Sequence, residues 1–273
     1  MSISINNEIS KLNNLSNLNE EKDYQKYEQS NEQSNEQLNE HSNDQSNEQK
    51  DKLYVIHNFN PSIYFLNEDI HFAKLHDKKL LITNIGKYSI TKPLQGKWIK
   101  SILIDFFKVK KLNTKFLSII DANAGIGGDT IYFSKYFKNV YSIEKNNIHF
   151  DVLTNNIKAL NLKNVDLYEG NFMNIINNKD NNLLNNKNIL YMDPPWGGPE
   201  YKKQKYIDLD IELDEPNEKK LNIVINELYP HFNVIFLKAP INIIIDKSTF
   251  LYKNIFFKDD PEKKILLIIF SKI

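Results

Sequence analysis

Short apolar runs alternate with amphipathic segments from residue 116 onward, and this alternation constrains the fold more than any other feature of the sequence. We expect β-strands at the apolar runs, which cover residues 116–121, 140–144, 165–170, 189–193 and 233–240. The segments between them have the spacing of amphipathic helices. Such alternation predicts an α/β protein with a mostly parallel sheet and helices on both faces.

The same pattern predicts where a ligand would bind. Helices are expected over residues 130–137, 147–160 and 218–229, and a closing antiparallel pair of strands over 254–258 and 263–273. In mostly parallel sheets, ligands bind at the carboxyl ends of the strands, near the point where the strand order reverses. Two conspicuous motifs, DANAGIGG and DPPWGG, each begin where a predicted strand ends, so we expect the functional site there.

The chain divides by composition into three parts. Residues 1–52 are dominated by Asn, Ser, Glu and Gln and contain a tandem SNEQ-type repeat, which predicts a disordered low-complexity tail. Residues 53–113 mix aromatic residues, lysines and short helical patterns, and are expected to form a small helical subdomain beside the strand ends. Residues 114–273 are expected to form the main α/β core.

Charge and cysteine content limit the classes of ligand and site. The net charge is zero, but residues 51–273 carry 31 lysines against 25 acidic residues, which suits a polyanionic ligand weakly. No arginine is present, so phosphate would be held by lysine, hydroxyl groups or backbone amides. The absence of cysteine excludes disulfides and cysteine-based zinc sites. With no apolar leader or long apolar segment, we expect an intracellular protein in a reducing compartment, nuclear or cytoplasmic, without a membrane span.

The glycine turn DANAGIGGDT lies between a predicted strand and a predicted helix. Gly125, Gly127 and Gly128 would let the backbone approach a ligand closely, beside the free amides of the helix start. Asp121 opens the turn, and acids here fit a cationic ligand with a free amino group better than a pyrophosphate. The alternative is a tight turn whose glycines serve packing only.

Two further strand ends carry polar residues that complete a nucleoside site. Glu144 ends the second predicted strand, where a carboxylate can accept both hydroxyl groups of a ribose. Asn171 and Phe172 follow the third, where an amide could contact the edge of an adenine and an aromatic ring its face. Together with the glycine turn, this set predicts S-adenosylmethionine as the cofactor.

The motif YMDPPWGGPEY predicts a rigid platform for an amine. Asp193 and the carbonyl of Pro194 can accept hydrogen bonds from one exocyclic amine and aim its lone pair at a methyl group. Trp196 offers a flat face for stacking, and tryptophan is the best side chain for a cationic ring such as 7-methylguanine. A proline-stiffened turn with a partly buried tryptophan is the structural alternative.

Three motifs together resemble the trimethylguanosine synthases, the cap-specific guanine-N2 methyltransferases. They are GKYSITKP at 86–93, DANAGIGGDT, and DPPWGGPEY, whose aspartate lies 72 residues after that of the glycine turn. The likeness covers about residues 60–273. It implies a class I, Rossmann-like S-adenosylmethionine-dependent methyltransferase fold, with a mostly parallel seven-stranded sheet and a small helical N-terminal subdomain that contributes to the cap site.

The resemblance also implies an activity and roles for individual residues. Methyl transfer to N2 of a 7-methylguanosine-capped RNA or cap analogue would form 2,7-dimethylguanosine and, with a second transfer, 2,2,7-trimethylguanosine, in a monomer without metal. Catalytic roles fall to Asp193, Pro194 and Trp196. Cofactor-binding roles fall to Asp121, Ala122, Gly125, Gly127, Thr130, Glu144, Asn171, Phe172 and Asp193. Substrate-binding roles fall to Trp196, Tyr201, Lys238, Ser89 and Thr91.

The sequence departs from the family at two positions, and two other functions remain open. Asn171 stands where the family has an acid, and Lys238 is the nearest cation to the place of a family arginine. An adenine-N6 methyltransferase would share the fold and DPPW, but would need neither GGPEY nor the KYSITKP segment. A non-catalytic cap-binding or scaffold protein would be expected to lack some of the acids Asp121, Glu144 and Asp193, which are all present.

Overall fold

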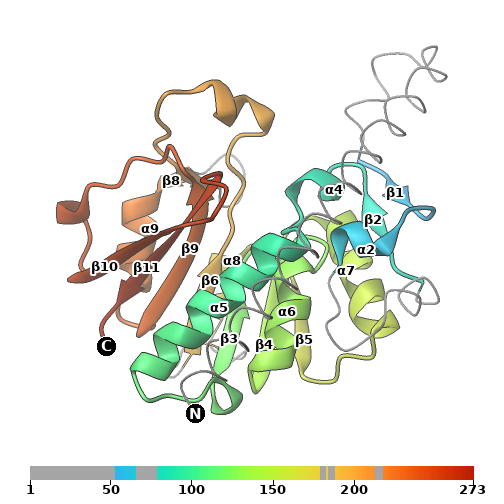
Figure 1. The fold of residues 1–273 in the computed structure, drawn as a ribbon, viewed down its shortest axis with the longest axis horizontal. Helices are drawn as coiled ribbons and strands as arrows, with labels where there is room; N and C mark the ends of the chain where they lie inside the picture. The colour runs from blue at the N-terminus through green and yellow to red at the C-terminus, as the bar shows by residue number, and fades with distance from the viewer. Residues whose placement is uncertain (1–52, 66–78, 179–182, 184–187, 213–217) are drawn as a thin grey trace, which may run out of the picture. The chain divides into compact units, whose positions relative to one another are not determined.

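The computed structural model describes residues 53–65, 79–178, 183, 188–212 and 218–273 of the chain (Figure 1). The predicted tail at 1–52 lies outside the described residues, as does most of the low-complexity stretch at 178–188. Residues 53–273 form one compact unit.

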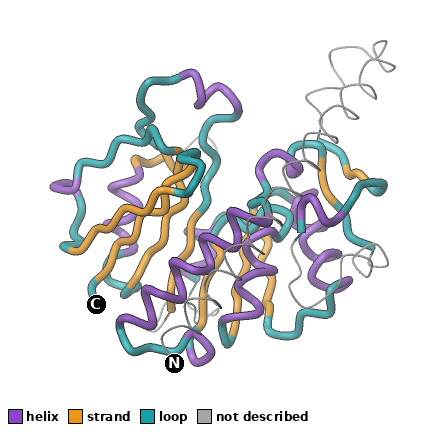
Figure 2. The backbone as a smooth tube through the Cα atoms, viewed as in Figure 1, coloured by secondary structure: helices purple, strands orange, loops and turns teal. Residues whose placement is uncertain are grey.

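A seven-stranded, mostly parallel sheet organises this unit, which confirms the fold class expected from the sequence (Figures 1 and 2). The strand order is β10-β11-β9-β6-β3-β4-β5, and only the pairs that involve β11 are antiparallel. The strands are β3 (Ser118–Asp121), β4 (Asn139–Glu144), β5 (Val165–Glu169), β6 (Asn188–Met192), β9 (Val234–Pro240), β10 (Asn254–Asp259) and β11 (Ile265–Ser271). The order reverses between β3 and β6, the strands that precede the two predicted motifs.

Helices cover both faces of the sheet because alternate strand residues point to opposite sides. One face packs against α5 (Pro93–Val109) and α6 (Gly128–Tyr136). Its core is apolar and rich in aromatic rings, among them Phe107, Phe133 and Phe236. The other face packs against α8 (Phe172–Asn177) and α9 (Leu221–Leu228).

A third apolar cluster joins α7 (Asn147–Ala159) to the residues before α5. The buried side chain of Asn156 accepts a hydrogen bond from Leu81 N and donates to the carbonyls of Leu81 and Ile126. The short elements of this region are β1 (Val55–Ile56), α2 (Pro61–Tyr64), β2 (Ile82–Thr83) and α4 (Gly86–Ser89). Strands β1 and β2 pair with each other, and α5 packs on the main sheet. The boundary of a separate N-terminal subdomain stays a prediction.

The predicted helix at 218–229 begins later than expected. Residues Glu218–Lys220 form β8, which pairs antiparallel with β7 (Asp210–Glu212), and α9 starts at Leu221. Lys220 Nζ lies 2.9 Å from Asp208 Oδ2 and from Asp210 Oδ2. Residues 218–220 are therefore extended because they contact β7 and the residues just before it. The remaining elements are the 3₁₀ turns η2 (Thr114–Phe116), η4 (Pro199–Lys203) and η5 (Lys247–Thr249).

The contact between α5 and α6 gives a direct test of the fold. A Cβ on Gly96 would overlap the ring of Tyr132, which is buried and donates its hydroxyl proton to Pro93 O at 2.9 Å. Gly96→Ala should therefore lower the free energy of unfolding by about 1–3 kcal/mol, although alanine is the better helix former. Lys108→Ala, at an exposed position of the same helix, is the control and should change it little. Urea titrations of both variants measure the free energy of unfolding. A Gly96→Ala variant that is more stable than the wild type would contradict the close packing of Gly96 against Tyr132.

Candidate active site

The two predicted motifs lie side by side at the reversal of strand order. Strand β3 ends at Asp121 and pairs in parallel with β6, in which Tyr191 lies opposite Asp121. Asp193 follows β6 directly. The glycine turn and the DPPW segment therefore share the carboxyl edge of the sheet, where ligands of such folds bind.

The glycine turn is held by the carboxylate that ends β4. Gly125 N donates to Glu144 Oε2 at 2.8 Å, and Asn146 N donates to Glu144 Oε1 at 2.7 Å. Gly125 and Gly127 have φ of 54° and 101°, a conformation that favours glycine. A Cβ on Gly125 would meet nothing within 4 Å, so the space beside this residue is open. Burial raises the pKa of Glu144, against the backbone donors that lower it.

Asp121 is buried and only half satisfied by the protein. Its Oδ2 accepts from Thr130 Oγ1 at 2.7 Å, and that hydroxyl lies 2.9 Å from Ser142 Oγ. Within the described residues, Asp121 Oδ1 and Asn123 Oδ1 are buried without a hydrogen-bond partner. Burial, and then the charge of Asp129, raises the pKa of Asp121 well above its usual value. Two buried acceptors without donors favour a ligand that brings its own N–H or O–H groups.

A buried polar network surrounds Asp193. Lys238 Nζ donates to Asp193 Oδ2 at 2.7 Å and to Thr91 Oγ1 at 2.8 Å. Thr91 Oγ1 in turn donates to Asp129 Oδ2 at 2.7 Å, and Tyr191 OH donates to the same oxygen at 3.0 Å. Burial raises the pKa of Asp193 to about 6; Lys238 opposes this rise and Asp129 adds to it.

The alternation of side chains along the strands explains why these groups meet. Tyr191 and Phe236 belong to the core cluster under α5 and α6. Two residues further along each strand, on the same face, are Asp193 and Lys238. Thr91 precedes α5, and Asp129 lies in the first turn of α6. The polar network thus continues the apolar core of this face to the carboxyl edge of the sheet.

Trp196 lies directly against this network. Its ring makes an edge-on contact with Tyr201, with centroids 5.2 Å apart and an interplanar angle of 89°. Lys238 Nζ lies 5.7 Å from the centroid of the Trp196 ring. The structure therefore brings together the predicted residues Asp193, Trp196, Tyr201, Lys238 and Thr91.

Other predicted residues lie elsewhere or serve local structure. Ser89 is exposed at the end of α4, and within the described residues it makes no hydrogen bond to the network. Asn171 caps α8 by accepting from Met173 N at 2.9 Å. Phe172 is 3% exposed within the core on the α8 side of the sheet. Ala122 is buried and donates its N–H to Tyr191 O at 2.9 Å. Ligand contacts for these residues stay predictions.

Sequence reasoning missed Asp129 and Tyr191. Asp129 carries a signal, since an acid in the first turn after a glycine turn is well placed at a helix start. Tyr191 could have been recognised as lying two residues before Asp193 in a strand, and therefore on the same face.

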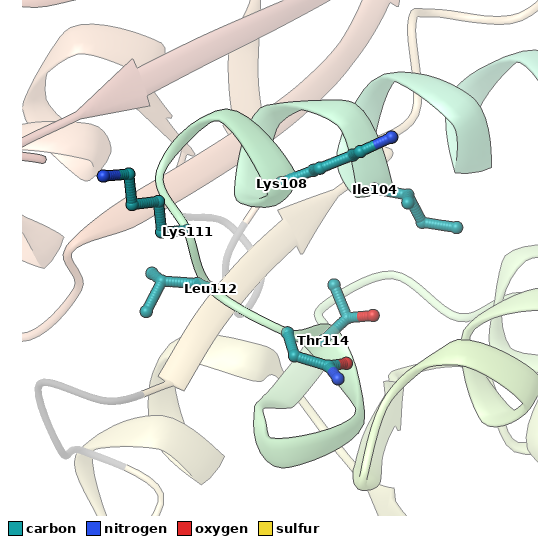
Figure 3. Close-up of a pocket in the computed structure, with 6 residues that line it drawn as sticks. Ile104, Lys108, Lys111, Leu112 and Thr114 are labelled. Atoms are coloured by element: carbon teal, nitrogen blue, oxygen red, sulfur yellow. The ribbon is translucent and has the colours of Figure 1, made fainter.

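A separate hollow lies at the other end of α5 (Figure 3). It is lined by Ile104, Lys108, Lys111, Leu112, Asn113 and Thr114. This segment leads into the start of β3, so it lies at the edge of the sheet away from the strand ends that carry the acids.

In the part of the chain that the structure describes, no group of three or more His, Asp or Glu side chains could hold a metal ion. Nor is any helix of that part long and apolar enough to cross a membrane.

The buried acid Asp121 generates a prediction about pH. Because its pKa is raised in the folded state, the folded chain binds more protons than the unfolded chain between the two pKa values. Stability must therefore fall as the pH rises through that window. Asp121→Asn, which cannot ionise, should raise the free energy of unfolding by about 1–3 kcal/mol at pH 8 and by much less near pH 4. Asp105→Asn, an exposed acid on α5, is the control. Thermal unfolding at both pH values measures the difference. An equal increase in stability at pH 4 and pH 8 would show that the ionisation of Asp121 does not cause it.

Comparison with known proteins points to a methyltransferase. The model of the family described as RNA cap guanine-N2 methyltransferase matches residues 116–259. The chain is 33% identical over 158 residues to Uncharacterized protein L320 of Acanthamoeba polyphaga mimivirus, covering 57% of this chain and 59% of that protein. It is 25% identical over 151 residues to the Trimethylguanosine synthase of Saccharomyces cerevisiae, covering 55% of this chain and 46% of that protein. The chain thus spans about half the length of the curated relatives it matches.

Solved structures also resemble the chain. The N-terminal domain of human METTL16 in complex with SAH matches with a TM-score of 0.46 and 10% identity, over 67% of this chain and 72% of that one. The family match contains both motif segments, the glycine turn after β3 and the DPPW segment after β6. The chain has the α/β, Rossmann-like methyltransferase fold and belongs to the RNA cap guanine-N2 methyltransferase family.

Proposed function

We propose that this protein transfers a methyl group from S-adenosylmethionine to the exocyclic N2 of a 7-methylguanosine RNA cap. The observation that carries the proposal is the placement of Asp193. This acid is held by Lys238 beside Trp196, next to the strand that leads into the glycine turn. The family match supports the cap guanine as the substrate.

The residues around the glycine turn fit the cofactor. The two oxygens of Glu144 accept the backbone N–H groups of Gly125, Lys145 and Asn146, and a carboxylate with about four lone-pair sites keeps capacity for a ribose hydroxyl. Asp121 Oδ1 and Asn123 Oδ1 offer buried acceptors to an amino group, and the space beside Gly125 is open. When bound, S-adenosylmethionine supplies an electrophilic methyl group on a sulfonium. Further contacts are proposed for Ala122, Gly127, Thr130, Asn171 and Phe172.

The DPPW segment fits the base and its amine. The amine of a guanine is a poor nucleophile because its lone pair is delocalised into the ring. Asp193 and the carbonyl of Pro194 would accept from this amine and orient it, while Trp196 stacks on the cationic base. Tyr201, in edge-on contact with Trp196, would reach the phosphates.

The number of methyl groups and the setting belong to the same proposal. One transfer forms 2,7-dimethylguanosine, and a second would form the trimethylated cap. We place the reaction in a reducing intracellular compartment, and the mimivirus relative supports the cytoplasm of a host cell. A monomeric state stays a prediction.

The substrate is tested by incubating the protein with labelled cofactor and 7-methyl-GTP, GTP or adenine-containing RNA. We expect transfer to N2 of 7-methyl-GTP, located by mass spectrometry, and little transfer to GTP. Stacking a cation on tryptophan in a desolvated site is worth ~2 kcal/mol, which is about thirtyfold in an equilibrium constant. Equal rates on GTP and 7-methyl-GTP would reject recognition of the cap, and methylated adenine would identify an adenine-N6 enzyme.

The role of Trp196 is tested by two substitutions. Trp196→Phe keeps a ring and should retain partial activity, whereas Trp196→Ala should lose nearly all of it through weaker binding of the cap. The dissociation constant of 7-methyl-GTP, measured by fluorescence quenching or calorimetry, should rise in the order wild type, Phe, Ala. Unchanged binding by Trp196→Ala would remove this residue from the cap site.

A further inference from the structure

Lys238 is a charged residue within a strand whose residues are all buried. Its side chain is 4% exposed, between Leu237 and Ala239, which are fully buried. An ammonium in such a place is tolerated only when it is paired and hydrogen-bonded. Lys238 meets this condition through Asp193 and Thr91. An ammonium enclosed in this way is poorly placed to bind a phosphate at the surface.

The orientation of the lysine is fixed from behind. Thr91 gives its hydroxyl proton to Asp129, so its oxygen must accept from Lys238. Asp129 is itself held by Tyr191. The network therefore joins the start of α5, the first turn of α6, and the strands β6 and β9. It fixes the orientation in which the ammonium of Lys238 donates to Asp193.

This arrangement divides the two oxygens of Asp193 between two tasks. Oδ2 accepts from Lys238 at 2.7 Å, and within the described residues no hydrogen bond to Oδ1 is found. We propose that Lys238 is a positioning residue, which holds Asp193 through Oδ2 so that Oδ1 accepts from the amine to be methylated. The identity of that amine rests on the proposed function.

Charge gives Lys238 a second effect on Asp193. Asp193 interacts electrostatically with five ionisable side chains, each from a different element. They are Asp121, Asp129, Tyr191, Tyr201 and Lys238. Lys238 is the one cation in this set. Burial raises the pKa of Asp193 to about 6 even with the lysine present. Removing the ammonium must raise this pKa further and leave less carboxylate to accept from the amine at neutral pH.

The experiment compares two substrates. Lys238→Met should lower kcat on the order of tenfold or more on both 7-methyl-GTP and the nucleoside 7-methylguanosine, since it acts on Asp193. The acidic limb of the pH profile of kcat should move to higher pH. A phosphate ligand would behave differently, since its loss would raise KM for 7-methyl-GTP and leave the nucleoside unaffected. Lys258→Met, an exposed lysine on β10, is the matched control. A loss confined to the triphosphate, or an unchanged kcat, overturns the proposal.

A second variant covers the case in which Lys238→Met does not fold. Thr91→Val keeps the shape of the side chain but removes one partner of Lys238. It should lower kcat several-fold, again equally on both substrates, with KM unchanged. A Thr91→Val enzyme with unchanged kcat would speak against the fixed orientation of the lysine and overturn the proposal.

A measurement without substrate separates this proposal from the proposed function. The titration of Asp193 can be followed by NMR in protein with ¹³C-labelled aspartate, with the resonance assigned from Asp193→Asn. Its midpoint should rise in Lys238→Met, or in Lys238→Gln where the former is unfolded, because both substitutions remove the ammonium, and it should stay unchanged in Lys258→Met. An unchanged midpoint overturns the proposal even if cap methylation is established. A raised midpoint in a protein that methylates neither guanosine substrate would reject the cap function alone.

Discussion

The ion pair between Lys238 and Asp193 is the interaction on which the geometry of the site depends. Lys238 cannot reach water from β9, so it must be satisfied inside the protein, and Asp193 and Thr91 satisfy it. Removing one partner of a buried pair leaves an uncompensated charge, which costs about 3–5 kcal/mol. The segment after β6 and the start of α5 are therefore fixed to the sheet together. A rigid acid is what the orientation of a poor nucleophile requires.

The same site gathers three acidic side chains around one lysine. Asp121, Asp129 and Asp193 lie near one another, and Lys238 is the cation bound among them. Their mutual repulsion adds to burial in raising the pKa of Asp121 and of Asp193. Such destabilised clusters are common where ligands bind, because a cationic ligand relieves the repulsion that the empty site carries. A sulfonium cofactor and a cationic cap base both have the charge that this cluster favours.

Much of the fold followed from local patterns, and the exceptions have a common cause. Apolar runs predicted the strands of the main sheet most clearly where both faces of a strand are buried, as in β9 and β11, whereas the edge strands β5 and β10 are partly exposed. The predicted start of α9 was wrong because residues Glu218–Lys220 pair with β7, and Lys220 forms ion pairs with Asp208 and Asp210, about ten residues earlier. Likewise, β1 and β2 pair across an intervening segment. Local spacing carries no information about such partners.

The site was predictable where chemistry coincides with strand ends. Asp121, Glu144 and Asp193 could be predicted as candidate site residues because each one ends or follows a strand. The hydrogen-bond partners of Lys238 could not be predicted in this way. A lysine inside an apolar strand does indicate a buried acid nearby, but Asp121 and Asp193 both satisfy that condition. Strand order and register decide between them: β9 neighbours β6 and not β3, and Met192 lies opposite Leu237, so the next residues along these two parallel strands are Asp193 and Lys238. Neither composition nor spacing specifies the register of strands 45 residues apart in sequence, and the role of this lysine emerges only when the sheet is formed.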